Sequence, residues 1–149
     1  MRTLRRILVA CTSRPPIAEY LSAAFARRGI EARIVHADEN TWFDRFVIHR
    51  VNKLAHNFRL LPKSRNLFED HPRSHMNYRS ARLRSAIRDY DPDLLFVIRG
   101  LGYRPWAFDG ARVKFAWWVE SDERVDEALA EVPAFDHYFL PLDSLRSPR

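Results

Sequence analysis

Two uninterrupted apolar runs constrain the fold of this chain more than any other feature. Residues 94–98 read Leu-Leu-Phe-Val-Ile, and residues 113–119 contain Phe-Ala-Trp-Trp-Val; each run follows turn residues and stops at charged residues. Runs of five to seven residues without polar alternation are typical of strands buried on both faces, as in parallel sheets covered by helices. The two runs therefore predict an α/β protein.

The N-terminal segment predicts a β-α-β unit. Residues 4–10 are a predicted strand, residues 17–28 a helix ended by Gly29, and residues 31–36 a second strand. Such a unit implies a parallel pair of strands joined by a right-handed crossover.

The whole pattern predicts a Rossmann-like open parallel sheet of about five strands in the order 2-1-3-4-5, with helices on both faces. A helix at 74–90, a short helix at about 124–131 and a fifth strand at 135–140 complete it. We expect one α/β domain over residues 1–143 and a tail over 144–149, since 149 residues suffice for one domain with a real core.

Two predicted amphipathic helices, 41–61 and 74–90, carry a strongly basic surface. The segment from Arg45 to Arg88 contains eleven Lys or Arg residues and only two acidic residues. Three interpretations of this basic face are open: it binds nucleic acid, it binds an anionic membrane or lipid-linked phosphate, or it is simply solvated. For the first helix we expect an inward stripe at helical spacing, which leaves no exposed aromatic platform for bases. Its members are Phe43, Val47, Val51, Leu54, Phe58 and Leu61.

The composition bears on the binding partners and on the cellular compartment. The net charge of +6 favours anionic partners, although 22 of the 25 basic residues are Arg and an Arg-rich proteome would give the same excess. The single cysteine, Cys11, excludes an internal disulfide framework and fits a reducing compartment. No stretch approaches the roughly 20 apolar residues of a membrane span. We expect a soluble cytoplasmic protein.

Several familiar site chemistries do not fit the sequence. The turn after the first strand contains no glycine, so neither a dinucleotide fingerprint nor a P-loop is expected, and no cofactor is predicted. Cys11 is followed six residues later by Ile17 where a phosphatase loop needs arginine, so we expect a core residue. His71 and His75 flank Pro72 without a further ligand, and we predict no metal site.

The candidate site residues all follow predicted strands. Open α/β sheets bind ligands at the carboxyl ends of their strands, so we expect these residues to converge on one rim. Their carboxylates could accept substrate hydroxyls or act as a base, although capping of the following helix explains one of them equally well. The predicted binding residues are Ser13, Arg14, Arg99, Gly100, Glu120 and Asp122, with Glu120 and Asp122 as the catalytic candidates.

The same stretch resembles a known family. Pro92-Asp93 opens an apolar strand, Arg99-Gly100 follows it, and Trp117-Trp118-Val119-Glu120 ends the next. Asp136, the strand Tyr138-Phe139-Leu140 and Asp143 fit as well. In these motifs and in element order the chain resembles the N-terminal domain of the spore-maturation (CgeB-like) glycosyltransferases, which have the two-domain GT-B fold.

The resemblance implies an acceptor-side domain. In that family the N-terminal half helps to form the acceptor side of a cleft, and the C-terminal half holds most of the nucleotide-sugar site. We therefore expect a truncated or partial chain that does not transfer sugar alone. A sugar or lipid-linked acceptor would be its partner, with a nucleotide sugar once a donor domain is supplied. We also expect self-association through a bare sheet edge.

A second class of function remains open. The chain could be a stand-alone α/β binding domain that uses its basic helical face for nucleic acid or another anionic surface.

Overall fold

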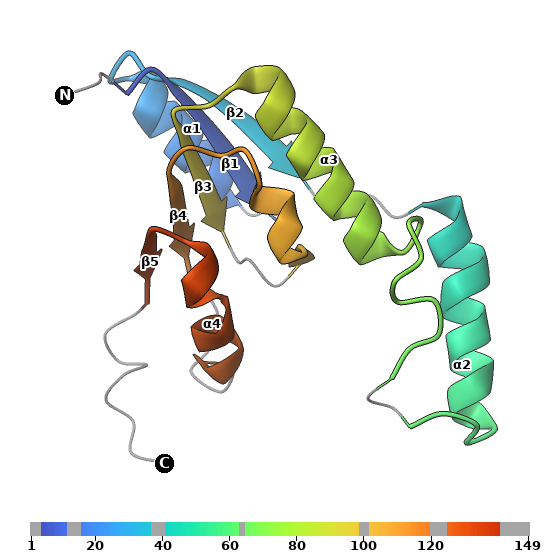
Figure 1. Cartoon of the computed structure of the whole chain (residues 1–149). Coiled ribbons are helices and arrows are strands. Elements are labelled where there is room, and N and C mark those ends of the chain that lie inside the picture. Colours follow the sequence, from blue (N-terminus) through green and yellow to red (C-terminus); the bar gives the residue numbers. More distant parts are fainter. Residues whose placement is uncertain are drawn as a thin grey trace.

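The five predicted strands pair into one all-parallel sheet in the order β2-β1-β3-β4-β5 (Figure 1). The computed structural model describes residues 4–11, 16–36, 41–62, 65–98, 102–119 and 125–140. The predicted fold class and strand order are confirmed. The strands are β1 (Arg6–Cys11), β2 (Glu31–His36), β3 (Leu94–Ile98), β4 (Lys114–Trp117) and β5 (His137–Phe139).

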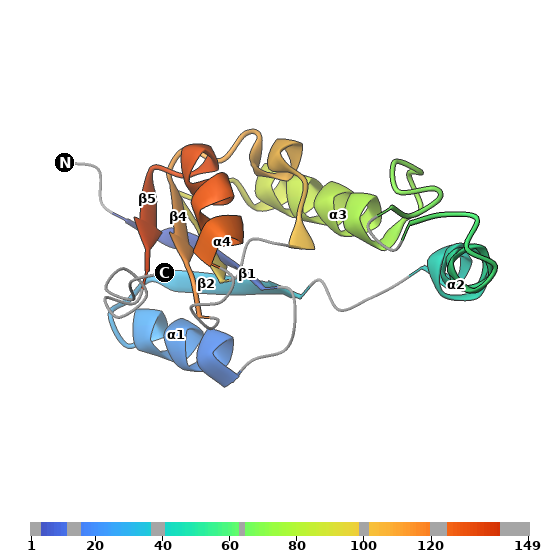
Figure 2. The same cartoon turned by 90° about the horizontal axis from the view of Figure 1, so that it is seen from below.

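Helices cover both faces of the sheet. Figure 2 shows α1 on one face and α3 and α4 on the other. This division follows from right-handed crossovers, since the chain moves from β1 to β2 in one direction and from β3 to β5 in the other. The helices are α1 (Pro16–Ala26), α2 (His49–Asn57), α3 (His75–Tyr90) and α4 (Val125–Glu131), with a π-helical turn at Asp44–Ile48 and 3-10 turns at Pro105–Phe108 and Val132–Ala134.

Strand β1 lies at the centre of the core. Its residues Ile7, Leu8, Val9 and Ala10 are fully buried. Because successive side chains of a strand point to opposite faces, Leu8 and Ala10 join the cluster under α3, whereas Ile7 and Val9 join the cluster under α1. Strand β3 behaves similarly and is buried on both faces, as its unbroken apolar run predicts.

The segment after β3 contains a structured turn that the sequence pattern does not reveal. The 3-10 turn Pro105–Phe108 buries Ala107 and Phe108, and Tyr103 just before it is also buried. All three pack in the cluster under α3. A single turn is too short to show the helical periodicity on which a sequence prediction depends.

Two aspartates close the amino edge of the sheet in the same way. The carboxylate of Asp93, one residue before β3, accepts the backbone N–H of Arg6 at 3.0 Å, and its own N–H donates to the Arg6 carbonyl at 2.9 Å. Asp136, one residue before β5, accepts the N–H of Lys114 at 2.7 Å and donates to its carbonyl at 2.9 Å. Each aspartate therefore supplies the partners that the first residue of a neighbouring strand would lack.

The stripe predicted for helix 41–61 lies beside the buried row rather than on it, and only part of it is covered: Phe43, Val47, Val51 and Leu61 are half-buried. Leu54 and Phe58 are 55% and 71% exposed, whereas Asp44, Ile48 and Asn52 form the buried row. Figure 1 shows the reason: α2 lies beyond the end of α3, away from the sheet, and packs on its own following segment. Its apolar stripe therefore has no sheet to cover.

Truncation of a central side chain tests the doubly covered sheet. Leu95 on β3 is fully buried, so we expect Leu95→Ala to lower the free energy of unfolding by about 2–5 kcal/mol. Urea unfolding followed by circular dichroism measures the loss. Val113→Ala, at a residue that is 38% exposed, is the matched control and should change stability by less than about 0.5 kcal/mol. Equal losses would contradict the assignment.

The aspartate contacts at the amino edge are testable separately. Asp93→Ala leaves the N–H groups of Arg5 and Arg6 without their carboxylate, and we expect a loss of about 1–3 kcal/mol. Asp93→Asn keeps one acceptor oxygen and should cost less. Asp89→Ala, with an aspartate side chain that is 63% exposed, should change stability by less than about 0.5 kcal/mol in the same urea titration. If Asp93→Ala is equally neutral, the carboxylate does not hold the sheet edge.

Candidate functional site

The carboxyl ends of four neighbouring strands lie in one row. Cys11 at the end of β1 pairs in register with His36 of β2 and with Ile98 of β3, and Ile98 pairs with Trp117 of β4. Loops that follow these residues start from the same edge of the sheet. In open α/β proteins this edge is the usual ligand site.

The predicted site residues follow this row directly. Residues 13 and 14 come after β1, residues 99 and 100 come after β3, and residues 120 and 122 come after β4. The premise of the predicted rim, that these strands are parallel neighbours, is confirmed. The convergence of the side chains remains a prediction, because all six lie outside the described residues: Ser13, Arg14, Arg99, Gly100, Glu120 and Asp122.

Cys11 and His36 contact each other across the two strand ends. The Cys11 Sγ lies 3.2 Å from Nδ1 of His36 and 3.8 Å from the Val35 carbonyl oxygen. A thiol beside an imidazole is the arrangement of a cysteine nucleophile. Cys11 is only 1% exposed, however, and belongs to the apolar cluster under α1, so substrate has no access to its sulfur. The pair braces the strand ends, as expected for a core cysteine.

Tyr103 holds the loop after β3 against the end of β1. Its hydroxyl donates a hydrogen bond of 3.2 Å to the carbonyl oxygen of Cys11, and the side chain is 6% exposed. Burial raises the pKa of Tyr103 well above the usual value of 10.0, and the neighbouring Cys11 adds to the shift. Tyr103 is therefore a neutral donor over the physiological range. No sequence pattern points to Tyr103, since it lies outside any periodic segment.

Trp118, two residues before the predicted acidic group in the sequence, has a buried polar atom. The side chain is fully buried directly after β4, and its backbone N–H donates to the Phe139 carbonyl at 2.9 Å. Among the described residues its indole Nε1 has no hydrogen-bond acceptor. A buried N–H without a partner costs free energy, and residues 120–124, which follow shortly after Trp118, lie outside the described residues.

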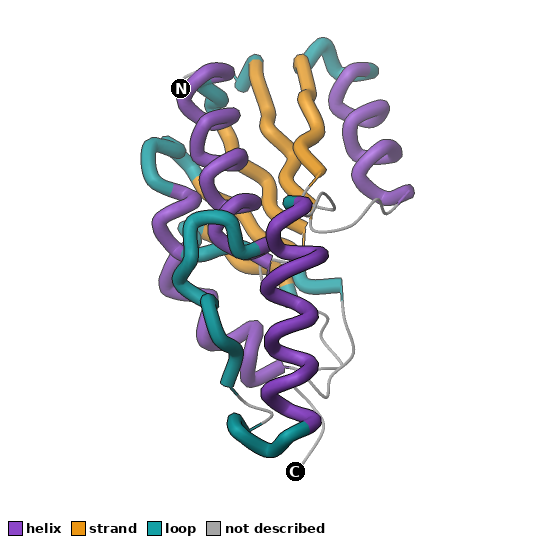
Figure 3. Tube along the Cα trace, turned by 90° about the vertical axis from the view of Figure 1, so that its right-hand side faces the viewer, coloured by secondary structure: helices purple, strands orange, loops and turns teal. Residues whose placement is uncertain are grey.

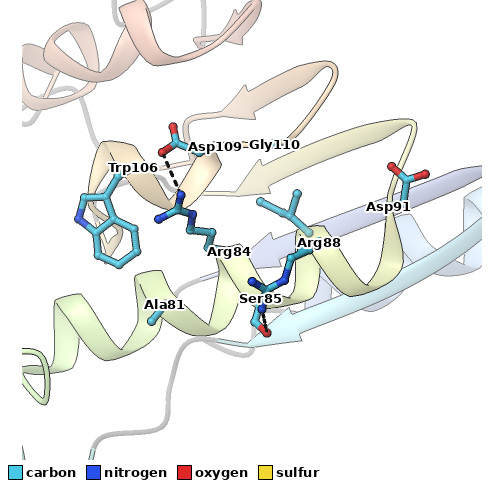
Figure 4. Close-up of a pocket in the computed structure, with 9 residues that line it drawn as sticks. Ala81, Arg84, Ser85, Arg88, Asp91, Trp106, Asp109 and Gly110 are labelled. Atoms are coloured by element: carbon cyan, nitrogen blue, oxygen red, sulfur yellow. Dashed lines mark hydrogen bonds and ion pairs between the residues drawn. The ribbon is translucent and has the colours of Figure 1, made fainter.

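A further hollow lies on the outer flank of α3 (Figure 4). It measures about 740 Å³ and is lined by α3 residues together with Trp106, Asp109 and Gly110 of the turn after β3. Its cations are engaged at the surface, since Arg84 lies 3.9 Å from Asp109 with both side chains more than half exposed. The hollow is open, and no strand-end residue is among those that line it, so we do not assign the candidate chemistry to it.

The sequence predicts no metal site and no membrane-spanning helix, and the described part of the chain bears on both expectations. It contains no group of three or more His, Cys, Asp or Glu residues placed to hold a metal ion. His71 packs against the Phe43 ring at 4.8 Å, and Nδ1 of His75 lies 3.5 Å from the Asp44 carboxylate. Among the same residues, no helix combines the length and apolar character needed to cross a membrane.

Comparisons with known proteins give no relative. No family model matches the chain, and neither a curated protein nor a solved structure is significantly similar to it.

The Tyr103 contact predicts an effect of pH on stability. We expect Tyr103→Phe to lower the free energy of unfolding by about 0.5–1.5 kcal/mol at neutral pH, because the bond to the Cys11 carbonyl is lost. The raised pKa means that the folded state keeps a proton that the unfolded state releases above pH 10.0. Stability contributed by this residue is thus present below that pH and lost as the pH rises beyond it.

Urea titrations at pH 8 and above pH 10 would measure this difference. Tyr103→Phe should decline less in the alkaline range than the wild-type chain does. Tyr20→Phe is the control, since Tyr20 is 73% exposed and should leave both values unchanged. A Tyr103→Phe chain with the wild-type alkaline decline would show that the hydroxyl does not titrate from a buried position.

Proposed function

We propose that this chain is the acceptor-side domain of a GT-B-type glycosyltransferase, and that sugar transfer requires a separate donor-binding unit. The observation that supports the proposal most is the row of strand ends. Ile98 and Trp117 pair in register, so the segments that begin at residues 99 and 120 leave adjacent strands at one edge. An arginine and two carboxylates in those segments suit the hydroxyl groups of a sugar acceptor.

The motifs that resemble the CgeB-like family divide into two kinds. Asp93 and Asp136 are accounted for by the amino edge of the sheet, where each bonds the first residue of a neighbouring strand. The functional part of the resemblance therefore rests on Arg99-Gly100 and on the segment from Trp117 to Glu120. The buried indole N–H of Trp118, for which the described residues offer no acceptor, is a donor within that segment.

The proposal assigns donor binding to a separate unit because of what binding a nucleotide sugar requires. A nucleotide-sugar donor brings a pyrophosphate, which backbone N–H groups of a glycine-rich turn bind closely. The chain has four glycines, and none lies in the turn between β1 and α1. Transfer also requires both reactants to be held in a near-attack geometry, so one wall of a cleft cannot supply it.

Ligand-induced stabilisation tests the proposal. We expect a member of a panel of mono- and oligosaccharides, with and without a lipid phosphate, to raise the thermal midpoint of residues 1–149. A ligand at 100 times its Kd stabilises the folded state by about 2.7 kcal/mol. Nucleoside diphosphates should give no shift, and nucleoside diphosphate release from nucleotide sugars should stay at the buffer level.

Matched variants connect the effect to the site. Arg99→Ala and Glu120→Gln should abolish the saccharide-induced shift, whereas Glu19→Gln on the exposed surface of α1 should retain it. Turnover of a nucleotide sugar by the isolated chain, or stabilisation by nucleotides and by no saccharide, would overturn the acceptor-side assignment.

A further inference from the structure

Residues 41–62 and 65–74 form a projecting lobe, which Figure 3 shows from the side of α2. Specific contacts hold it together. The Asn52 side-chain amide donates to the Leu67 carbonyl at 3.1 Å and accepts the Leu67 N–H, while the Asp44 carboxylate accepts the N–H of His75 at 3.0 Å. The Thr41 hydroxyl donates to the carbonyl of Arg73 at 2.7 Å. These hydrogen bonds fix the fold of the lobe, so the residues on its outer surface can be identified.

The outer row of this lobe is apolar. Buried residues Asp44, Ile48 and Asn52 recur every four positions, and residues two positions away lie on the opposite side of the helix, about 200° around its axis. That opposite row carries Trp42 at 70%, Phe46 at 42% and Leu54 at 55% exposure, with Arg50 between the last two, and Phe58 just past the end of α2 is 71% exposed.

The exposed apolar side chains gather in the lobe. Leu60, Leu67 and Phe68 are also exposed in the lobe, at 76%, 38% and 48%, with Leu67 on the side of α2 that carries Asn52. With them, the lobe holds seven of the fourteen large apolar residues that are exposed in the described chain. Scattered single residues of this kind are normal, but a cluster marks an interaction surface.

Basic residues are interleaved with this surface. The guanidinium groups of Arg45 and Arg50 each lie 5.7 Å from the centre of the Phe46 ring. Lys53 and Arg59 are also exposed. None of these four cations forms an ion pair with a carboxylate in the described part of the chain.

The acidic residues of the lobe do not offset these cations. Asp44 is buried beside His75, and Glu69 and Asp70 lie 3.5 and 3.2 Å from the guanidinium of Arg104, outside the lobe. The outer surface is therefore apolar and positively charged at the same time.

We propose that the projecting lobe docks on the surface of an anionic lipid bilayer, with α2 lying in the plane of the interface. Aromatic and leucine side chains enter the boundary between headgroups and acyl chains, while the surrounding cations meet the lipid phosphates. This inference is independent of the proposed sugar transfer.

Two other occupants fit the surface less well. Single-stranded nucleic acid stacks on aromatic rings, but the exposed aliphatic side chains Leu54 and Leu60 would make no such contact. A second copy of the chain would bring two positively charged surfaces together, which like-charge repulsion opposes. A bilayer uses both the aliphatic side chains and the charge.

Vesicle flotation tests the proposal on the whole chain. We expect residues 1–149 to float with phosphatidylcholine vesicles that contain phosphatidylglycerol, and to bind pure phosphatidylcholine much more weakly. The double variants Trp42→Ser/Phe58→Ser and Arg50→Glu/Lys53→Glu should each lower the partition coefficient by about tenfold or more.

Matched controls lie outside the lobe. Tyr20→Ser on α1 removes an aromatic residue that is 73% exposed, and Arg88→Glu on α3 reverses a charge on a side chain that is 80% exposed. Both should retain wild-type flotation. Because every substituted side chain is exposed, thermal melts should show that all variants fold.

Several outcomes would overturn the proposal. Absence of flotation with anionic vesicles does so directly. Equal losses in the control variants would show that net charge or general hydrophobicity, rather than the lobe, drives binding. Salt-sensitive binding to random single-stranded DNA without vesicle binding would assign the surface to nucleic acid. A dimer in sedimentation velocity that Trp42→Ser/Phe58→Ser abolishes, again without vesicle binding, would assign it to a second copy.

Discussion

Burial of β1 on both faces is the constraint on which the rest of the structure depends. A strand flanked by β2 and β3 can satisfy its backbone only through ladder hydrogen bonds, and its side chains need helices above and below. Parallel pairing then forces every connection to cross the sheet from the carboxyl edge back to the amino edge. The two edges therefore differ: all strands start at one, and all of their following loops begin at the other.

The amino edge is occupied by structural contacts. Asp93 and Asp136 complete the hydrogen bonding of Arg6 and Lys114, and Asp91 pairs with Arg112 at 2.8 Å. Acidic residues at strand starts thus have a sufficient structural explanation. The acidic residues predicted for the carboxyl edge, Glu120 and Asp122, lie outside the described residues and stay predictions. This difference separates motif residues that stabilise the fold from those that remain candidates for chemistry.

Sequence predicted the strands well and the surfaces poorly, for physical reasons. Uninterrupted apolar runs such as 94–98 have one stable environment, so their position in the sheet follows. By the same rule, the apolar stripe that contains Leu54 and Phe58 would be buried only if a core lay beneath it. Here Asp44 and Asn52 turn inward instead, because each bonds backbone groups that the lobe would otherwise bury unsatisfied. Patterns of hydrophobicity contain no information on such a bond.

The lobe and the carboxyl edge are joined by a short series of contacts. Tyr103 bonds the end of β1, and the next residue, Arg104, donates its N–H to Ser80 of α3 at 2.8 Å and pairs with Asp70 at the base of the lobe. The lobe itself is inserted after β2 and before α3, so it extends from the carboxyl side of the sheet (Figure 1). A bilayer bound by the lobe would therefore lie on the side of the sheet where the strands end. An acceptor carried on a lipid phosphate would reach the candidate site from that side, whereas a freely diffusing acceptor would gain nothing from the lobe. The two proposals, although independent, together favour a lipid-linked acceptor.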